Sequence, residues 1–432
     1  MFRECNAGFA ESSADPAHLP VWTASVSGWY PIAGGGAMKR HRKYVVAVLL
    51  WLVACSASSQ PAGQAPVANA SPGVTAERIL FGQSAALGGP AANLGTEMRR
   101  GIVAAFEEVN RAGGVAGRRL ELRSYDDRYE PELAIDNTRR LIDEDRVFAL
   151  IGAVGTPTAA ATEPIARAAA VPFIAPFSGA EFLRDPALGH VVNVRASYFE
   201  ETETIVARLI GDLGIARIAV LYQDDSFGRS GLAGVRRALE RRGLDLVGAG
   251  TYMRNTTAVK TALLGLKRQN PEAIIVIGAY QPSAVFTQWA RKLGIDARIV
   301  NISFVGSDAL AAALNESGNG VYVSQVMPFP EGEELPLQSQ YRQALVSSDA
   351  NARPSYGSLE GYIAGRLTAA VLALAGNPPT REGFLSALGD AGRFDIGGFT
   401  LQYGRRDNRG SHKVYLTVIR DGAVVPTDRL AR

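Results

Sequence analysis

Residues 152–158 carry the sequence GAVGTPT, in which glycines precede a hydroxyl residue and a proline. Thr156 followed by Pro157 predicts a helix N-cap with proline at the first helical position. The free amides of a first helical turn attract anions, and a neighbouring glycine lets a ligand come close. At the carboxyl end of a strand, where open α/β sheets bind ligands, such a helix start suits a carboxylate. We therefore expect Thr156 to contact a ligand as well as to cap the helix.

Two further loops offer polar groups at predicted strand ends. The sequence PFSGAEF, which starts at Pro176, presents Ser178 and a glycine, Gly179, that permits close approach. Its alternative role is a turn with a capping serine. The sequence FVGSDAL places Ser307 and Asp308 at a predicted strand-to-helix junction. Asp308 is either a counter-charge for a ligand ammonium or a first-turn acid that the helix dipole favours.

Aromatic side chains occur in the corresponding loops of the second half of the chain. Tyr198 and Phe199 lie at a predicted junction, Phe227 follows one predicted strand, and Tyr280 follows another. Core packing is the usual role of aromatic residues. Ligand pockets are also lined mainly by apolar and aromatic groups, and the repeated position at strand ends favours ligand contact for Tyr198, Phe227 and Tyr280.

Sequence motifs of the common enzyme classes are absent. The sequence has no GxSxG elbow, HExxH, CxxC pair or P-loop, and the histidines that follow residue 54, His190 and His412, are far apart. Acid pairs at residues 126–127 and 224–225 are adjacent in extended chain, so their side chains point in opposite directions and form no dyad. We expect those acids to solvate loops and cap helices, and we expect no catalytic residue, metal site or cofactor.

Charge and cysteine content limit the class of partner. Removing the five Lys/Arg and three Asp/Glu of residues 1–54 from totals of 45 and 42 leaves 40 basic and 39 acidic residues. This near-neutral balance gives no support for nucleic-acid binding or for a polybasic membrane surface. The two cysteines are Cys5 and Cys55, so the domain after residue 55 contains no internal disulfide.

The N-terminal region has the pattern of an export signal. Met38 is followed by a basic cluster at residues 39–43 and an apolar run at residues 44–54, which is too short to span a membrane and suits a signal peptide at residues 38–54. The run ends in LVAC, which resembles the lipobox of bacterial lipoproteins. We expect lipidation at Cys55 and a periplasmic or extracytoplasmic, membrane-anchored protein; an ordinary signal peptide cut nearby is the alternative. We interpret residues 1–37 as a mis-assigned or unstructured start and residues 55–74 as a flexible tether.

Strands and amphipathic helices alternate after residue 75. Continuous apolar strands separated by helices indicate parallel sheets covered on both faces. Because one sheet of about ten or more strands is unusual, we predict two lobes. Helix patterns at about residues 335–347 and 359–375 precede antiparallel strands with turns at residues 406–410 and 421–422. Predicted parallel strands are residues 79–82, 120–125, 148–151, 172–175, 191–194, 218–222, 246–251, 273–277, 299–302 and 321–325.

The order of several soft motifs resembles type I periplasmic solute-binding proteins of the branched-chain amino acid (Leu/Ile/Val-binding) ABC transporter family. The motifs, between about residues 78 and 426, are SAALGGPAANLG, FEEVNRAGGVAGR, FALIGAVGTPT, VPFIAP, YQDDSFGRSG, GAYQPSA and FVGSDAL. The resemblance implies an α/β fold of two Rossmann-like lobes with parallel sheets, joined by a three-crossover hinge near residues 195, 327 and 393. Lobe 1 then comprises residues 75–195 and 327–393, and lobe 2 comprises residues 196–326 and 394–432.

The same resemblance implies roles for individual residues. In the family, hydroxyls and amides of the loop after the third strand hold the carboxylate of an amino acid, and this loop corresponds to Gly155 and Thr156 here. Contacts from the next loop and from lobe 2 correspond to Phe177, Ser178, Gly179, Phe227, Tyr280 and Asp308.

Three departures from the family pattern widen the range of ligands. Gly179 stands where amino acid binders often have threonine, Leu94 stands where an aromatic is common, and Asp308 replaces a glutamate. We therefore expect a lipid-anchored binding protein, without catalysis, that delivers a small carboxylate-bearing solute to an ABC permease and its ATPase. The solute is an amino acid, another aliphatic or aromatic carboxylic acid, or an amide. The alternatives are a periplasmic regulator of a cell-wall synthase and a ligand-sensing module with the same fold.

Overall fold

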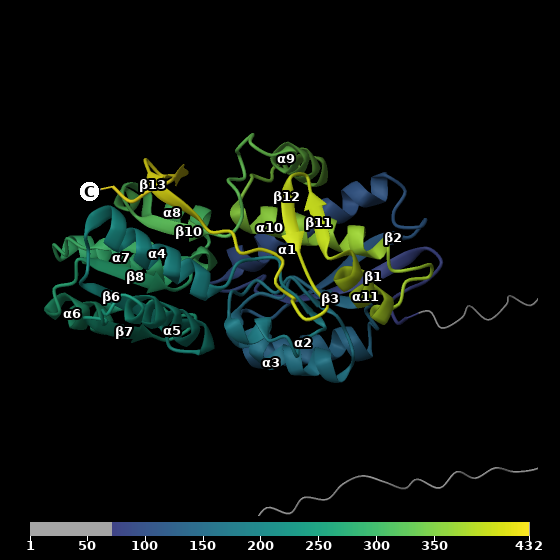
Figure 1. Ribbon diagram of the computed structural model, residues 1–432, viewed down its shortest axis with the longest axis horizontal. Coiled ribbons are helices and arrows are strands. Elements are labelled where there is room, and N and C mark those ends of the chain that lie inside the picture. The colour runs from purple at the N-terminus through teal and green to yellow at the C-terminus, as the bar shows by residue number, and fades with distance from the viewer. Residues whose placement is uncertain (1–70, 432) are drawn as a thin grey trace, which may run out of the picture. The chain divides into compact units, whose positions relative to one another are not determined.

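The structure, a computed structural model, describes residues 71–431. The predicted signal peptide, the lipidation at Cys55 and most of the predicted tether lie outside the described residues. The described chain contains a five-stranded sheet, a seven-stranded sheet and a small two-stranded sheet, which belong to two lobes (Figure 1).

Lobe 1 is built on a parallel sheet with the strand order β2-β1-β3-β4-β5. The strand β1 (Arg78–Ala85) of this sheet is buried along nearly its whole length, as expected for a strand covered on both faces. The elements are β1 (Arg78–Ala85), α1 (Ala92–Arg111), β2 (Arg119–Asp126), α2 (Pro131–Asp143), β3 (Ala149–Ile151), α3 (Thr156–Ala168), β4 (Phe173–Ile174), the 3-10 turn η1 (Glu181–Arg184) and β5 (Val191–Val192).

Lobe 2 is built on a sheet with the strand order β14-β13-β10-β9-β8-β6-β7, which is parallel except for β13 and β14. Together, the sheets of the two lobes contain a strand at each of the ten predicted positions, so all ten predicted parallel strands are confirmed. The elements are α4 (Tyr198–Leu213), β6 (Ile218–Gln223), α5 (Ser226–Glu240), β7 (Gly248–Tyr252), α6 (Lys260–Arg268), β8 (Ala273–Ile277), α7 (Tyr280–Lys292), β9 (Arg298–Asn301), η2 (Ser303–Val305), α8 (Ser307–Leu314), η3 (Asn315–Gly318), β10 (Tyr322–Gln325), β13 (Tyr415–Arg420) and β14 (Ala423–Thr427).

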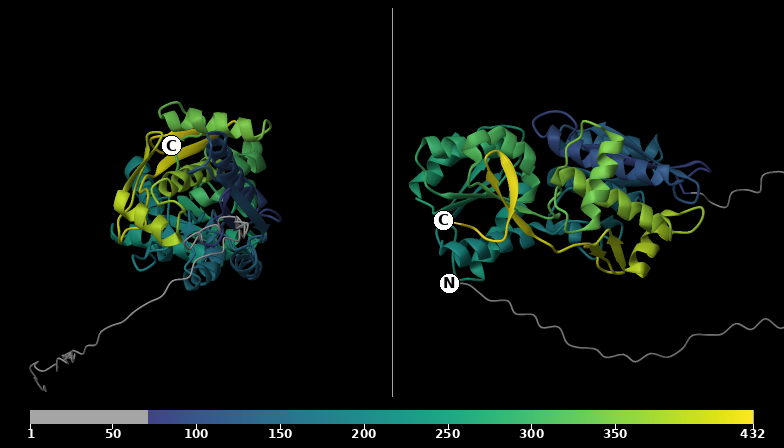
Figure 2. Two further views of the ribbon diagram at one scale, coloured as in Figure 1. Left: turned by 90° about the vertical axis from the view of Figure 1, so that its right-hand side faces the viewer. Right: turned by 90° about the horizontal axis from the view of Figure 1, so that it is seen from above.

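The remaining elements return to lobe 1 before the chain ends on lobe 2. The helices α9 and α10 pack on α1, and β11 and β12 pair with each other beside α10 (Figure 1). Figure 2 shows the following segment, drawn in yellow, running from these strands to lobe 2. The elements are α9 (Pro336–Ser348), α10 (Tyr356–Leu372), α11 (Arg381–Ala391), β11 (Arg393–Ile396) and β12 (Phe399–Gln402).

The third crossing therefore lies between β12 and β13, later in the chain than the predicted position near residue 393. Two contacts hold the intervening residues on lobe 1. The turn between β11 and β12 receives a hydrogen bond from Leu337 N to Gly397 O (2.9 Å). After β12, the backbone of Asn193 next to β5 pairs with Asn408 and Gly410 at 2.9 Å each. The other two crossings include Arg195 and Met327.

The helices α1 and α10 lie unusually close together, because glycines face each other at the contact. A Cβ on Gly101 would lie 1.8 Å from the carbonyl oxygen of Ser358, and a Cβ on Gly361 would lie 2.2 Å from that of Met98. Such distances exclude any larger residue without a backbone shift. The contact fixes the N-terminal ends of both helices, which carry residues of the site described below.

The predicted α/β fold of two lobes with parallel sheets is confirmed. Within residues 71–431, no helix has both the length and the apolar character needed to cross a membrane.

Candidate functional site

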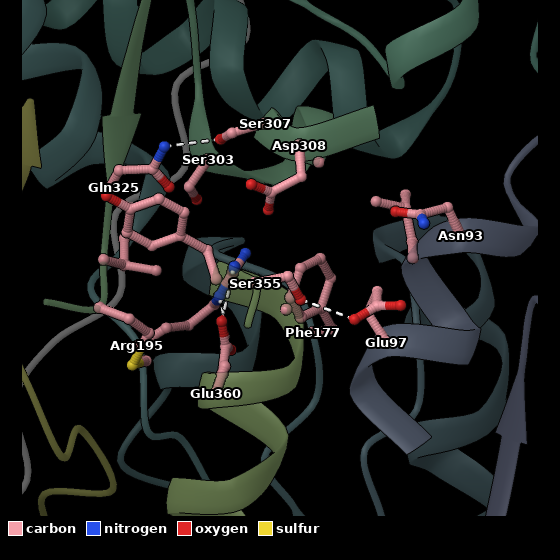
Figure 3. Close-up of a pocket in the computed structure, with 16 residues that line it drawn as sticks. Asn93, Glu97, Phe177, Arg195, Ser303, Ser307, Asp308, Gln325, Ser355 and Glu360 are labelled. Atoms are coloured by element: carbon pink, nitrogen blue, oxygen red, sulfur yellow. Dashed lines mark hydrogen bonds and ion pairs between the residues drawn. The ribbon is translucent and has the colours of Figure 1, made fainter. Parts of the chain in front are cut away.

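A cavity lies between the lobes, at the carboxyl ends of strands from both sheets (Figure 3). Its volume of about 20 Å³ is room for about one water molecule, so a larger ligand requires the lobes or their side chains to move. Polar residues of the lining are Asn93, Glu97, Arg195, Ser303, Ser307, Asp308, Gln325, Ser355 and Glu360; the apolar residues include Leu94, Phe177, Met327 and Tyr356. We call this space the interlobe cavity.

The lobe 1 wall of the interlobe cavity joins the N-terminal half of α1 to the N-cap of α10. Ser355, the N-cap of α10, donates a hydrogen bond to Glu97 on α1 (Oγ to Oε2, 2.7 Å) and accepts one from the backbone N of Ser358 (3.1 Å). The other oxygen of Glu97 forms an ion pair with Arg100. The acid Glu97 is thus held in place and partly neutralised.

The lobe 2 wall contributes Asp308, in the first turn of α8. Within residues 71–431, no basic side chain lies within 4.0 Å of its carboxylate. The side chain is exposed where it faces the cleft, yet protein atoms replace much of the surrounding water. This desolvation raises the pKa of the Asp308 carboxyl to about 6, against the lowering effect of the Tyr356 backbone and with a smaller rise from the charge of Glu97. Asp308 is therefore available to a cation from solution.

A buried acid fixes the loop that precedes α8. The carboxylate of Glu201 on α4 accepts hydrogen bonds from Ser303 N (2.8 Å), Ser303 Oγ (3.0 Å) and Ser324 Oγ (2.6 Å). Burial raises the pKa of Glu201, and these donors together with Arg195 oppose the rise. Nearby, Gln325 donates to Ser307 Oγ at 2.6 Å. The polar groups of the lobe 2 wall are therefore oriented by bonds within lobe 2.

The floor of the interlobe cavity is a buried ion pair at the first crossing. Arg195 donates from Nε and Nη2 to the two carboxylate oxygens of Glu360 on α10, at 2.9 Å each. Both side chains are 1% exposed. The ring of Phe177 lies 4.1 Å from the guanidinium carbon, which keeps the pair in one orientation.

Three of the predicted ligand contacts form a separate buried group, which we call the hydroxyl cluster. Thr156 Oγ1 lies 2.8 Å from Ser178 Oγ and 3.3 Å from the Tyr198 hydroxyl, and all three side chains are fully buried. The predicted capping role of Thr156 is wrong: Gly155 is the N-cap of α3, and no side chain caps it. The Thr156 hydroxyl bonds across to the neighbouring loop instead, so these three hydroxyls satisfy one another.

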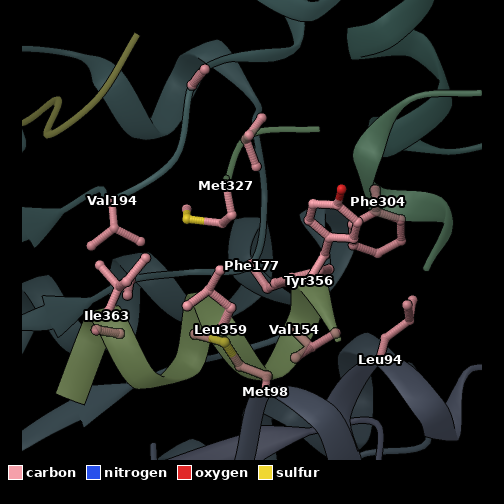
Figure 4. Packing of buried hydrophobic residues seen from close by; sticks show 14 of the residues in the cluster. Leu94, Met98, Val154, Phe177, Val194, Phe304, Met327, Tyr356, Leu359 and Ile363 are labelled. Carbon is pink, nitrogen blue, oxygen red and sulfur yellow. The ribbon is translucent and has the colours of Figure 1, made fainter. Parts of the chain in front are cut away.

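An aromatic layer lies beside the hydroxyl cluster, at the contact between the lobes. Phe304 is fully buried, and its ring centroid lies 4.4 Å from Phe227, 5.6 Å from Phe177 and 5.9 Å from Tyr129. Figure 4 shows Phe304 and Phe177 within the hydrophobic cluster that also contains residues of α1 and α10. Tyr129 and Phe177 belong to lobe 1 whereas Phe227 and Phe304 belong to lobe 2, so this packing holds the lobes together.

The predicted glycines make room for aromatic rings. A Cβ on Gly155, where φ is +107°, would lie 2.1 Å from the Tyr129 ring. A Cβ on Gly179 would lie 2.5 Å from the Tyr198 ring. Tyr280, the first residue of α7, lies near Gly306 on the lobe 2 side, 3.8 Å from a Cβ placed there.

The predicted site residues thus fall into two groups. Phe177 and Asp308 line the interlobe cavity. The other predicted residues do not line it; they are Gly155, Thr156, Ser178, Gly179, Tyr198, Phe227 and Tyr280.

Sequence reasoning missed several cavity residues, above all Glu97 and Glu360. A signal for Glu360 exists in the sequence YGSLEGYIAG, where an acid occupies an otherwise apolar helix and so requires a buried partner. Glu97 gives no such signal, because its sequence neighbours do not distinguish a buried acid from the exposed acids that are common on amphipathic helices. The acid pairs at residues 126–127 and 224–225 do have their predicted roles in loops and caps; Asp225, for example, caps α5.

Polar contacts also join the outer rims of the lobes. Arg254 next to β7 pairs with Glu130 of lobe 1 (Nη2 to Oε2, 2.6 Å), and Asn255 donates to the other oxygen of Glu130 (2.7 Å). Deeper between the lobes, the buried Gln223 side chain donates to the buried Tyr129 hydroxyl at 3.2 Å. Within residues 71–431, no group of three or more His, Cys, Asp or Glu side chains is arranged to hold a metal ion.

Comparisons with known proteins agree with this architecture. The family described as periplasmic binding protein matches residues 79–423. The Leu/Ile/Val-binding protein homolog 7 of Brucella abortus (strain 2308) is 30% identical over 251 residues, which are 56% of this chain and 61% of the relative. The chain therefore spans less than two thirds of that curated relative.

Two solved structures are similar over most of the chain. A possible leucine/isoleucine/valine-binding protein from Rhodopirellula baltica SH 1 is 37% identical, with a TM-score of 0.78, and the match covers 83% of this chain and 98% of that one. A substrate-binding periplasmic protein from Ralstonia solanacearum is 29% identical, with a TM-score of 0.75, and the match covers 81% and 100%. The chain belongs to the periplasmic binding protein family of solute-binding proteins, in the type I class that includes the Leu/Ile/Val-binding proteins.

Proposed function

We propose that the protein is the extracytoplasmic substrate-binding component of an ABC importer, and that it binds a small amino acid in the interlobe cavity. The observation that carries this proposal is the composition of the cavity wall. Lobe 2 presents the carboxylate of Asp308 without a basic partner among residues 71–431, and lobe 1 presents Ser355, Tyr356 and Phe177 opposite it. A ligand held by both lobes stabilises their contact, as hinge closure around a solute requires.

We assign the predicted site residues either to direct contact with the ligand or to the wall behind it. Asp308 pairs with the ligand ammonium, and Phe177 contacts its apolar part. The hydroxyl cluster and the rings of Phe227 and Tyr129 form the wall behind Phe177. Gly155 allows the Tyr129 ring to pack, and Gly179 allows the Tyr198 ring to pack. Thr156 and Ser178 contact the ligand only if the Phe177 ring moves away from its position between them and the cavity. We propose no catalytic step.

The proposed partners follow from the family and from the N-terminal sequence. An ABC permease and its ATPase receive the solute from the closed protein. The LVAC sequence supports a lipid anchor at Cys55, which would hold the protein at the extracytoplasmic face of a membrane. Labelled palmitate should appear on the wild-type protein and be absent from Cys55→Ala. Incorporation into both proteins contradicts the anchor and leaves the solute-binding proposal untouched.

A thermal-shift screen with amino acids, amines and organic acids tests the proposal. A ligand at about 100 times its Kd adds about 2.7 kcal/mol to the free energy of unfolding, which is a measurable rise in Tm. We expect L-amino acids to stabilise the protein more than their D-enantiomers, which serve as controls of equal charge. If none of the amino acids, amines or acids stabilises the protein, the importer proposal is contradicted and a regulatory or sensing role is favoured.

A further inference from the structure

One nitrogen of the buried guanidinium of Arg195 has no hydrogen-bond partner. Nε and Nη2 are taken by Glu360, whereas Nη1 is buried and unpaired within residues 71–431. Leaving a buried donor unpaired is costly, and nearly all such groups in folded proteins are paired. A donor of this kind requires an explanation.

The position of Arg195 gives that explanation. Arg195 lines the interlobe cavity, and Figure 3 shows its guanidinium between Glu360 on one side and Ser303 and Asp308 on the other. On one side the Phe177 ring covers it. Arg195 therefore belongs to the wall of the space that a ligand enters, and the bidentate bond of Nε and Nη2 to Glu360 leaves the unpaired nitrogen on the side of the guanidinium away from Glu360.

The charges around the cavity define what fits. Glu360 forms the ion pair with Arg195, the charge of the buried Glu201 also acts on Arg195, and Arg100 pairs with Glu97. Asp308 lacks such a partner within residues 71–431. Among the lining residues, Arg195 therefore offers a buried, unpaired donor for an oxygen, and Asp308 offers a carboxylate without a basic partner among residues 71–431. A plain monocarboxylate would add a second negative charge beside Asp308, whereas a ligand with an ammonium and an acceptor oxygen satisfies both groups.

We infer that Arg195 Nη1 is the specificity-determining donor that receives the carboxylate or carbonyl oxygen of the ligand, while Asp308 holds its ammonium. This inference rests on the proposed function and goes beyond it. It moves the oxygen subsite from the hydroxyl cluster, where Thr156 and Ser178 already satisfy each other, to the hinge. The substrate class is then a compact amino acid or amino amide, and plain organic acids are excluded.

Matched ligand pairs test this role by calorimetry on the exported protein. The probes are L-leucine with 3-methylbutylamine and L-phenylalanine with 2-phenylethylamine; within each pair, the amine lacks only the carboxylate. We expect the wild-type protein to bind the amino acid of the better pair at least about tenfold more tightly than its amine. Arg195→Lys keeps a positive charge beside Glu360 but shortens the donor. It should weaken binding of the amino acid by about 10- to 100-fold and binding of the amine by less than about threefold.

Arg381→Lys is the control, because the Arg381 guanidinium donates only to backbone carbonyls of Val147, Phe148 and Ala169, away from the cavity. It should leave both affinities unchanged. Equal loss for amino acid and amine in Arg195→Lys would assign Arg195 a purely structural role and overturn the inference. Equal wild-type affinity for both probes overturns it as well, and this measurement decides the matter where Arg195→Lys does not fold. Absence of binding by all four probes instead contradicts the proposed function.

Discussion

The hydroxyl cluster and the interlobe cavity both bring polar side chains together at the contact between the lobes, yet their polar groups differ in state. In the hydroxyl cluster, Thr156, Ser178 and Tyr198 bond to one another behind a layer of rings. In the cavity, Asp308 lacks a basic partner and one nitrogen of Arg195 lacks a hydrogen-bond partner among the described residues. Residue type and strand-end position therefore identify candidate contacts, whereas the pairing of each group decides which of them a ligand uses.

Removing the Phe304 ring is the strongest test of whether the aromatic layer separates the hydroxyl cluster from the interlobe cavity. Phe304→Ala deletes a fully buried ring that contacts both lobes, and we expect a loss of about 3–5 kcal/mol in the free energy of unfolding, measured in urea. It should also change ligand affinity. Phe286→Ala is the control, since Phe286 is equally buried but packs only within lobe 2. It should lower stability with little effect on affinity, and an equal effect of both variants on affinity would mean that the aromatic layer does not separate the regions.

Asp308 and Thr156 give the most direct comparison of the two regions in binding. Removing one member of a charge pair that the ligand desolvates costs about 2–5 kcal/mol, so Asp308→Ala should abolish measurable binding of an amino acid in calorimetry. Asp308→Asn should recover part of it. Thr156→Val should lower affinity less than about threefold, because Thr156 is fully buried and bonded within the protein. The reverse order of losses would place the ligand at the hydroxyl cluster.

The sequence predicted most of the fold because its signals are local. Each parallel strand is a short apolar run, and each helix has an apolar face, so alternation alone indicates two parallel sheets. The third crossing could not be placed in this way. Antiparallel strands were predicted in this region with turns at residues 406–410 and 421–422, whereas β11 and β12 turn at residues 397–398. The place of these strands on lobe 1 follows from tertiary contacts, such as the bond between Leu337 and Gly397.

The site was predictable only in outline. Strand-end loops identified Phe177 and Asp308, which line the cavity. Whether a hydroxyl such as that of Thr156 faces a ligand depends on its distance from Ser178, a residue 22 positions away in sequence. The role of Arg195 depends on Glu360, which is 165 positions away. Pairings of this range follow from tertiary packing and leave no local pattern.

Asp127 supports the lobe 1 side of the aromatic layer and makes the free energy of unfolding depend on pH. The fully buried carboxylate accepts hydrogen bonds from the Tyr129 amide (2.9 Å) and Ser84 Oγ (2.8 Å). Burial raises the pKa of Asp127 from 3.8 to about 7, so the folded state binds the proton more tightly than the unfolded state between these values. Its contribution is therefore most favourable below about pH 4 and is lost as the pH rises toward 7, with no further change above that.

Asp127→Asn should remove this dependence. Relative to the wild type, we expect the variant to gain about 2 kcal/mol in the free energy of unfolding between pH 5 and pH 8, measured by urea titration at both values. Asp296→Asn, a change at an exposed carboxyl of lobe 2, is the control and should show no such gain. A gain of equal size in the control would mean that the effect is general to the protein's charge and does not come from Asp127.

Breaking the ion pair between Arg254 and Glu130 at the rim tests whether the contact between the lobes depends on buried rings or on surface charges. We expect this change to have the smallest effect. Arg254 and Glu130 are 22% and 39% exposed, and pairs of this kind contribute about 0–1 kcal/mol. Glu130→Gln should therefore lower ligand affinity less than about fivefold, and salt should reduce the difference further because it screens exposed charges. Asp224→Asn is the matched control, since Asp224 pairs with Arg229 within lobe 2 (3.2 Å) and not across the lobes. Calorimetry at low and high salt measures both variants. A loss above about tenfold in Glu130→Gln alone would show that the rim, rather than the packing of Phe304 against Tyr129 and Phe177, controls closure over the cavity.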